Sequence, residues 1–129
     1  MPEAERAVRD LLQRYFDALY ASDADALRAV LHPRAIYVCA TGEDFVYKTV
    51  DEYLPVVAER PSPASRNEAR RDSIDSIELA GANTARARVR CSIGDRDFID
   101  FLTLVRDADR WSIISKVFHY DTRSSEGQA

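Results

Sequence analysis

The spacing of the apolar residues changes along this chain near residue 66. Before that point they recur mainly every three or four residues, as on one face of a helix, apart from one hairpin, and after it they alternate with polar residues, as in a half-buried strand. The stretch "ARARVRCSI", residues 85–93, shows the alternation best, because its arginines all fall on one face. This order predicts an α+β fold in which helices cover one face of a curved antiparallel sheet.

Two helices are expected at the start of the chain. Apolar residues at helical spacing predict a long amphipathic helix over residues 3–21. Ser22 or Asp23 is expected to cap a second helix, which Pro33 then ends. His32 precedes that proline, and we assign it to the end of the second helix.

A hairpin is expected over residues 34–48, and Thr49 with Glu52 has the capping-box spacing that opens a short third helix. Four further strands follow, joined by the turn sequences "AGAN", "GDRD" and "RDADR", and they predict an antiparallel meander. We therefore expect a single domain over residues 1–122 and a flexible tail over residues 123–129.

Composition excludes several classes of protein. The 129-residue chain has a formal net charge of −4, which disfavours nucleic acids and anionic membranes as partners. No apolar run is long enough to span a membrane and the first residues do not resemble a leader peptide, so a cytoplasmic location is expected. Cys39 and Cys91 are expected to be free thiols, and no spacing of cysteine and histidine predicts a metal site or a cofactor.

Two charged residues interrupt the apolar pattern of "FIDFLTLVRDADRWSIISKVFHY", residues 98–120. If a three-residue turn joins the last two strands, Asp100 lies opposite Lys116, and both share a face with Phe98, Leu102 and Phe118. One interpretation is a cross-strand salt bridge at an edge or exposed end of the sheet. The other is a polar pair inside an apolar cavity, where it fixes the strand register or contacts a ligand.

The same register predicts an apolar outer face on the sheet. Its expected members are Ile99, Phe101, Val105, Trp111, Ile113 and Val117. Because a monomer would expose this patch to water, we expect a homodimer that pairs two outer faces across a two-fold axis. The arginines of the 85–93 stretch and His119 are expected toward the polar rim, with Glu78 opposite Arg86.

The segments "RYFDALYASDADALRAVLHPRA" and "DFLTLVRDADRWSIISKVFHY", in that order, resemble the nuclear transport factor 2-like superfamily, and within it the SnoaL-like and putative lumazine-binding group. The resemblance covers nearly the whole chain. It implies a cone-shaped, cystatin-like fold in which three helices close over a strongly bent sheet, with a ligand cavity between them. The superfamily includes isomerases, dehydratases, hydrolases and transport factors, so the fold alone implies no reaction.

Within that superfamily, the segment "QRY" is similar to the first helix of ketosteroid isomerases. The similarity places Tyr15 at the oxyanion-hole tyrosine and Asp100 near the protonated aspartic acid. The position of the general-base aspartate is occupied by Cys39, so the isomerase reaction does not carry over. Tyr15 can equally be a core aromatic residue with a bonded hydroxyl, and Cys39 a small buried residue.

Three functions remain open. The first is a small-molecule-binding domain of unassigned activity, whose pocket includes Tyr15, Cys39, Asp100, Lys116 and Tyr120. The second is an isomerase, dehydratase or hydrolase that uses Asp100 as acid or base and Tyr15 as oxyanion donor. The third is a structural or regulatory dimer with a filled core and no ligand.

Overall fold

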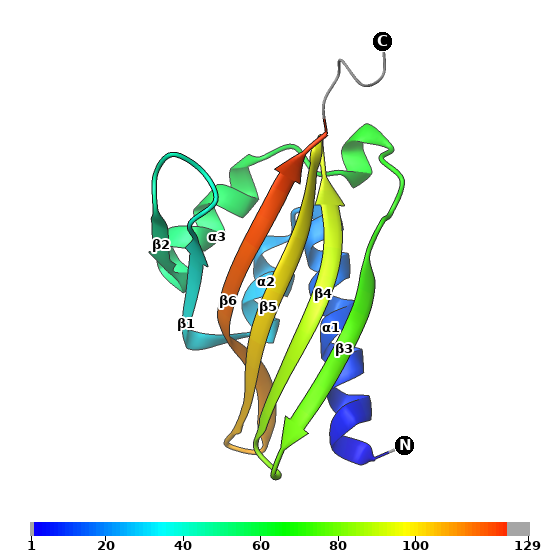
Figure 1. The fold of residues 1–129 in the computed structure, drawn as a ribbon, viewed down its shortest axis with the longest axis vertical. Helices are drawn as coiled ribbons and strands as arrows, with labels where there is room; N and C mark the ends of the chain where they lie inside the picture. The colour runs from blue at the N-terminus through cyan, green and yellow to red at the C-terminus, as the bar shows by residue number, and fades with distance from the viewer. Residues whose placement is uncertain (1, 124–129) are drawn as a thin grey trace.

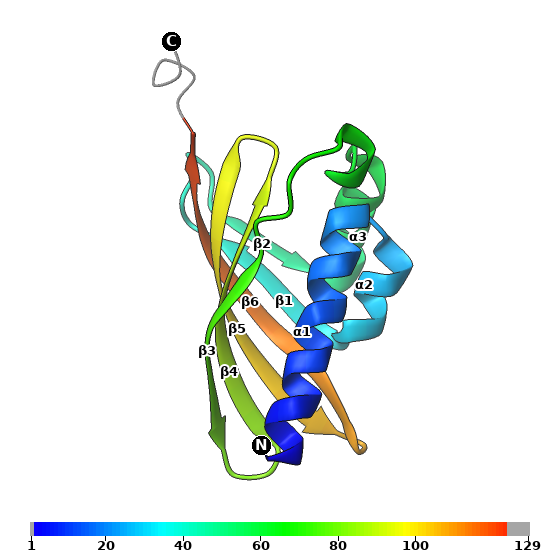
Figure 2. The same ribbon diagram turned by 90° about the vertical axis from the view of Figure 1, so that its right-hand side faces the viewer.

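The computed structural model describes residues 2–123, which fold into two layers (Figures 1 and 2). One layer is a six-stranded sheet, and the other consists of helices that all lie against one face of that sheet. The elements are α1 (Glu3–Ala21), α2 (Ala24–Val30), β1 (Leu31–Cys39), β2 (Val46–Thr49), α3 (Val50–Glu59), the short 3₁₀ helix η1 (Ala64–Arg66), β3 (Ser73–Ala80), β4 (Thr84–Ile93), β5 (Arg96–Asp107) and β6 (Arg110–Thr122). The predicted α+β class is confirmed. Residues 124–129 of the predicted tail lie outside the described residues.

The strands are ordered β2-β1-β6-β5-β4-β3 across the sheet. The predicted hairpin (β1–β2) and the predicted meander (β3 to β6) are both present and antiparallel. The sheet is nevertheless mixed, because β1 pairs in parallel with β6. This pairing brings β1, from the first third of the chain, beside the last strand, so residues of β1 and β6 face the same helices (Figure 1).

The helix ends follow local rules. Asp23 caps α2 by accepting a hydrogen bond from the backbone N–H of Ala26 at 3.0 Å, and Thr49 and Glu52 form the predicted capping box of α3. The placement of His32 in the second helix is wrong, since α2 ends at Val30 and His32 lies in β1. The cause is Pro33, which restricts the residue before it to extended conformations.

The register of the last two strands differs from the prediction by two residues. A two-residue turn with positive φ at Ala108 and Asp109 joins β5 to β6, where three residues were expected, and this shifts the register by one residue. An extra residue in β6 shifts it by one more. Asp100 therefore pairs with Phe118, and Lys116 pairs with Leu102. A shift of two leaves each side chain on its predicted face, so Asp100 and Lys116 both still point toward the helices.

A β-bulge changes the faces nearer the turn. Thr103 pairs with Ser115 but Leu104 pairs with Ile113, so one extra residue of β6 lies between them. The extra residue reverses the alternation, and Trp111 and Ile113 face the core instead of the outer surface. Their assignment to the outer face is wrong. The outer face keeps Ile99, Phe101, Val105 and Val117, of which Phe101 is 60% exposed.

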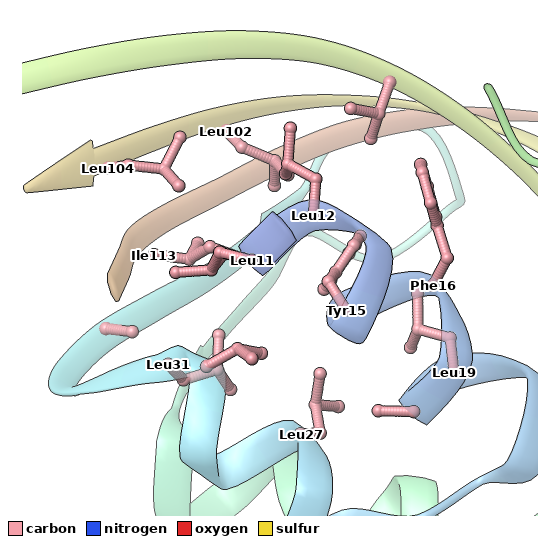
Figure 3. Close-up of a cluster of buried hydrophobic side chains, with 14 of the residues drawn as sticks. Leu11, Leu12, Tyr15, Phe16, Leu19, Leu27, Leu31, Leu102, Leu104 and Ile113 are labelled. Carbon is pink, nitrogen blue, oxygen red and sulfur yellow. The ribbon is translucent and has the colours of Figure 1, made fainter. Parts of the chain in front are cut away.

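The core lies between the two layers (Figure 3). Leu11 and Leu12 of α1 pack toward Leu102, Leu104 and Ile113 of the sheet. These side chains are 1% exposed or less, so burial of aliphatic surface stabilises this part of the fold, by about 1.5–3 kcal/mol for each side chain. Of the helices in the described part of the chain, none is both long and apolar enough to cross a membrane.

Candidate functional site

Lys116 lies inside a cluster of aromatic rings. Its Nζ is 5.2–5.5 Å from the ring centroids of Tyr15, Tyr37, Tyr53 and Phe118. These rings come from α1, β1, α3 and β6, so the cluster exists only because both layers and the parallel β1–β6 pair meet there. Ring faces attract a cation, which partly compensates the ammonium for the water it has lost.

Asp100 is fully buried beside this cluster. The Tyr15 hydroxyl donates a hydrogen bond of 2.6 Å to Asp100 Oδ2, and Lys116 Nζ lies 4.0 Å from the same oxygen. β5 and β6 are interior strands of the sheet, so the interpretation of the pair as a salt bridge at an edge or exposed end is excluded. Removing one partner of such a buried pair strongly destabilises a protein, because the other charge then remains buried without compensation.

The ionisation of these groups follows from their burial. Burial, followed by the nearby Asp100 carboxylate, raises the pKa of Tyr15 well above its ordinary value, so Tyr15 remains a neutral donor. Burial alone would lower the pKa of Lys116, but its electrostatic interactions with Tyr53, Asp100 and Tyr37 raise that pKa, and the net direction is upward. At neutral pH the site therefore holds an ammonium, and this ammonium is a poor nucleophile.

Two polar atoms next to the ring cluster lack hydrogen-bond partners among the described residues. They are Oδ1 of Asp100 and the hydroxyl oxygen of Tyr53, on side chains that are 0% and 3% exposed. A buried polar group without a partner costs about 1–3 kcal/mol. The site thus offers one free acceptor on Asp100, one free hydroxyl on Tyr53 and the donors of Lys116.

A small cavity lies beside Lys116. Its volume is about 10 Å³, which is room for one water molecule. The rings of Tyr37 and Tyr53, which line it, stack with centroids 4.1 Å apart. The cavity is lined by Tyr15, Leu31, Ala35, Ile36, Tyr37, Val50, Tyr53 and Lys116. A ligand larger than water can enter only if these side chains move.

The other two predicted pocket residues lie farther along the same face of the sheet. Cys39 is buried in β1, where it pairs with Val46 and Phe118, and it does not line the cavity. Tyr120 lies at the end of β6, with the guanidinium of Arg96 4.3 Å from its ring centroid. The structure therefore brings Tyr15, Asp100 and Lys116 together, and places Cys39 and Tyr120 outside that group.

Sequence reasoning missed several residues of the site. Tyr37 could have been found, because it shares the alternation of Cys39 in "RAIYVCA". Tyr53 could not, because its contact with Lys116 depends on how α3 docks on the sheet. Cys91 was predicted as a free thiol, but its electrostatic interaction with Asp100 was missed; burial, and then Asp100, raise its pKa to about 12. The thiol is therefore unreactive at neutral pH.

The remaining candidates lie away from the site. His119 is on the outer face as predicted, where its ring nitrogens contact Thr41 and Asp121 at 2.9 and 3.0 Å. His32 contacts Asp107 at 3.0 Å. Both cysteines are free thiols, as predicted. In the described part of the chain, no three His, Cys, Asp or Glu side chains form a group that could hold a metal ion.

Comparisons with known proteins agree with the resemblance read from the sequence. A family model described as "Putative lumazine-binding" matches residues 3–119. An NTF2-like protein of unknown function from Silicibacter pomeroyi has a TM-score of 0.82 and 23% identity, over 94% of this chain and 100% of that one. Another from Shewanella baltica has a TM-score of 0.82 and 18% identity, over 94% and 98%.

A ketosteroid isomerase-like protein from Erwinia carotovora atroseptica has a TM-score of 0.74 and 12% identity, over 95% of this chain and 99% of that one. At such identities the likeness establishes the fold alone. A search of curated proteins finds no match. The predicted nuclear transport factor 2-like, cystatin-like fold is confirmed.

Proposed function

This chain belongs to the family described as putative lumazine-binding, and we propose that it binds a small planar molecule between its helices and its sheet. The observation that carries the proposal is the pair of unpartnered buried atoms, Asp100 Oδ1 and the Tyr53 hydroxyl oxygen, beside an aromatic cavity. Small-molecule sites commonly combine an apolar lining with a few convergent polar groups. A ligand that paired with these atoms would remove a cost that the unliganded fold carries.

The aromatic side chains favour a planar ligand. Tyr37 and Tyr53 already form a stacked pair, and a flat heterocycle could replace one ring in that stack with little loss of contact. Lumazine, the compound in the family's description, is a planar bicyclic molecule with carbonyl and N–H groups. Its carbonyls could accept hydrogen bonds from Lys116, and an N–H could donate to Asp100.

The small cavity sets a condition on binding. Because only about 10 Å³ is open, a bicyclic ligand must displace a side chain before it reaches Lys116. Tyr37 is the side chain best suited to move, because it is half-buried whereas Tyr15 and Tyr53 are buried. Binding would then be accompanied by movement of β1 side chains, while the aliphatic contacts of α1 stay in place.

A thermal-shift screen tests this proposal. Lumazine and a panel of planar bicyclic heterocycles are added at 1 mM, and the melting temperature is recorded. A ligand at ten times its Kd adds about 1.4 kcal/mol, which corresponds to roughly 4–6 °C for a chain of this size. Tyr37→Leu should lower the affinity for the best ligand at least five-fold. Tyr47→Leu is the matched control, since Tyr47 is 58% exposed on β2.

Native mass spectrometry of protein purified without denaturation supplies a second readout. A retained small molecule that is lost on unfolding would support the proposal and identify the ligand. The proposal is wrong if the panel gives no shift and the native mass equals that of the chain alone. Such a result would leave the filled-core interpretation, in which the polar cluster is structural.

Catalysis by Asp100 and Tyr15 is the second candidate function. It is favoured by the 2.6 Å hydrogen bond that places a proton donor directly on a buried carboxyl group. To act as an oxyanion donor, however, the Tyr15 hydroxyl would have to leave Asp100. Asp100→Asn separates the alternatives, because a variant that binds ligand but loses turnover would establish catalysis, and unchanged chemistry would exclude it.

We also propose that the chain forms a homodimer through the outer face of the sheet. Phe101 and Val117 are 60% and 41% exposed there, next to a surface hollow of about 530 Å³. Light scattering should return about twice the 14.6 kDa chain mass. Phe101→Arg should lower the mass toward that of one chain, whereas Val56→Arg, on the helix layer, should not. A wild-type mass of one chain at micromolar concentration would exclude the dimer.

A further inference from the structure

Arg60 has an unusual environment for an arginine. It is the residue that ends α3, and its side chain turns inward so that Nε and Nη2 are buried. Neither nitrogen has a hydrogen-bond partner among the described residues. A guanidinium that served only solubility would extend into water, because burying a charge without a partner is costly. This arrangement therefore indicates that the two nitrogens have a use inside the molecule.

Arg60 directly follows the helix that carries Tyr53 of the ring cluster. Burial raises the pKa of Tyr37 on β1 and of Cys91 on β4, and the charge of Arg60 partly opposes both rises, so it is within electrostatic reach of both strands. Lys116 acts on the same two side chains in the same direction. Arg60 and Lys116 are thus two cations that influence one region of the helix–sheet interface.

The negative charges nearby do not balance them. Asp100 is the one carboxyl group that is buried in the described part of the chain, and Tyr15 and Lys116 already contact it. Asp72 also acts on Cys91, but its carboxylate accepts two hydrogen bonds from Arg70, at 2.8 and 3.0 Å. Once these pairs are formed, Arg60 is the one of these described groups whose charge has no partner.

From this charge distribution we infer that the ligand is a small organic anion, namely a planar ring that carries a carboxylate. Arg60 Nε and Nη2 pair with the two carboxylate oxygens, since a guanidinium edge matches a carboxylate in geometry. The ring stacks with Tyr37 or Tyr53, and Lys116, although paired with Asp100, supplies hydrogen-bond donors deeper in the interface. The inference rests on the proposed small-molecule site and adds to it the charge of the ligand and the residue that recognises it.

Arg60 also explains how a closed interior could admit such a ligand. Its side chain is long and half-buried, and no hydrogen bond of Nε or Nη2 holds it inward. Arg60 can therefore bind a carboxylate that approaches the end of α3 without first breaking a hydrogen bond of Nε or Nη2 within the protein. The groups most easily displaced, Arg60 and Tyr37, are then the groups that contact the ligand.

The experiment compares two probes of nearly equal shape, quinoline-2-carboxylate and quinoline-2-carboxamide, by isothermal titration at pH 7.5. The carboxylate should bind wild-type protein at least ten-fold more tightly than the amide. Arg60→Gln should lower the affinity for the carboxylate at least ten-fold and change the affinity for the amide less than two-fold. Arg86→Gln is the matched control, because Arg86 is an exposed arginine paired with Glu78 on the outer side of β4.

Salt dependence provides a measurement that needs no variant. Raising NaCl from 50 to 500 mM should weaken binding of the carboxylate several-fold and leave the amide unchanged. Equal affinity of the two probes, or a carboxylate affinity that survives Arg60→Gln, would overturn the anion inference while leaving the small-molecule site intact. Binding of neither probe, together with no shift in the heterocycle screen, would overturn both, with water as the occupant of the cavity.

Discussion

The helix–sheet interface has two unlike halves. The aliphatic half is made of Leu11, Leu12, Leu27, Leu102, Leu104 and Ile113, all 1% exposed or less and without polar side-chain atoms. The polar half is made of Tyr15, Tyr37, Tyr53, Asp100 and Lys116, and holds an ion pair, stacked rings and unpartnered atoms. Both halves lie between the same two layers, so their difference comes from side chains and not from the backbone.

This difference separates stability from function. Close packing of aliphatic side chains stabilises a fold without imposing any requirement on hydrogen bonding. A buried polar cluster contributes little when fully satisfied and is costly when it is not. The fold can carry the polar half because the aliphatic half stabilises it, and the polar half is consequently where a ligand could be bound.

The largest effect is expected in the aliphatic half. Leu104→Ala removes a fully buried side chain of β5 and leaves a cavity, which should lower the free energy of unfolding by about 4 kcal/mol. Urea denaturation measures it, and an unchanged m-value would show that the native and unfolded states are otherwise alike. A loss below about 1 kcal/mol would mean that this half is not the main source of stability.

The next effect concerns the ion pair. Lys116→Met leaves Asp100 buried without its cation and should lower the free energy of unfolding by about 3 kcal/mol at pH 7. Adding Asp100→Asn removes the uncompensated charge, so the double variant should recover at least half of that loss. If the two losses simply add, Asp100 and Lys116 are not energetically coupled and the polar half is not a unit.

Alkaline pH should lower the free energy of unfolding through the polar half of the interface. The raised pKa of Cys91, from 9.0 to about 12, means that the folded state holds this proton more tightly than the unfolded state. The contribution of this protonated thiol to the free energy of unfolding is therefore complete below pH 9 and is lost as the pH rises toward 12. Raised pKa values at Tyr15 and Lys116 act in the same direction.

The variant Cys91→Ala isolates the share of this alkaline loss of stability that is due to the thiol. Between pH 9 and pH 11, wild-type protein should lose about 2 kcal/mol more unfolding free energy than the variant. Urea denaturation of both proteins at pH 7, 9 and 11 checks this, with pH 7 as the reference. Parallel curves would show that the Cys91 thiol ionises equally well in the folded and unfolded states.

Much of the difference between the aliphatic and polar halves could be predicted from the alternation of apolar and polar residues along the strands. The strand pattern placed Asp100 and Lys116 on one face of the sheet, and this assignment survived the two-residue register shift because the period is two. The bulge in β6 could not be predicted, since "WSII" gives apolar residues to either face. Trp111 and Ile113 were misplaced for that reason.

The parts of the site that come from α3 were not predictable. Tyr53 lies on a ten-residue helix with a proline inside it, and Arg60 directly follows that helix. Nothing in the helix sequence specifies which strand it contacts. Their approach to Lys116 and Tyr37 depends on the parallel pairing of β1 with β6, which joins segments nearly 80 residues apart. Long-range docking of this kind leaves no local signal.

The most direct test of the account is the single substitution Tyr53→Phe, measured both for stability and for affinity toward the best ligand of the heterocycle screen. It removes an unpartnered hydroxyl, so the free energy of unfolding should stay within about 0.5 kcal/mol of wild type or rise. If that hydroxyl serves the ligand, affinity should fall about five-fold, the equivalent of one hydrogen bond. A stability loss of about 2 kcal/mol with unchanged affinity would contradict the account, because the hydroxyl would then be structural.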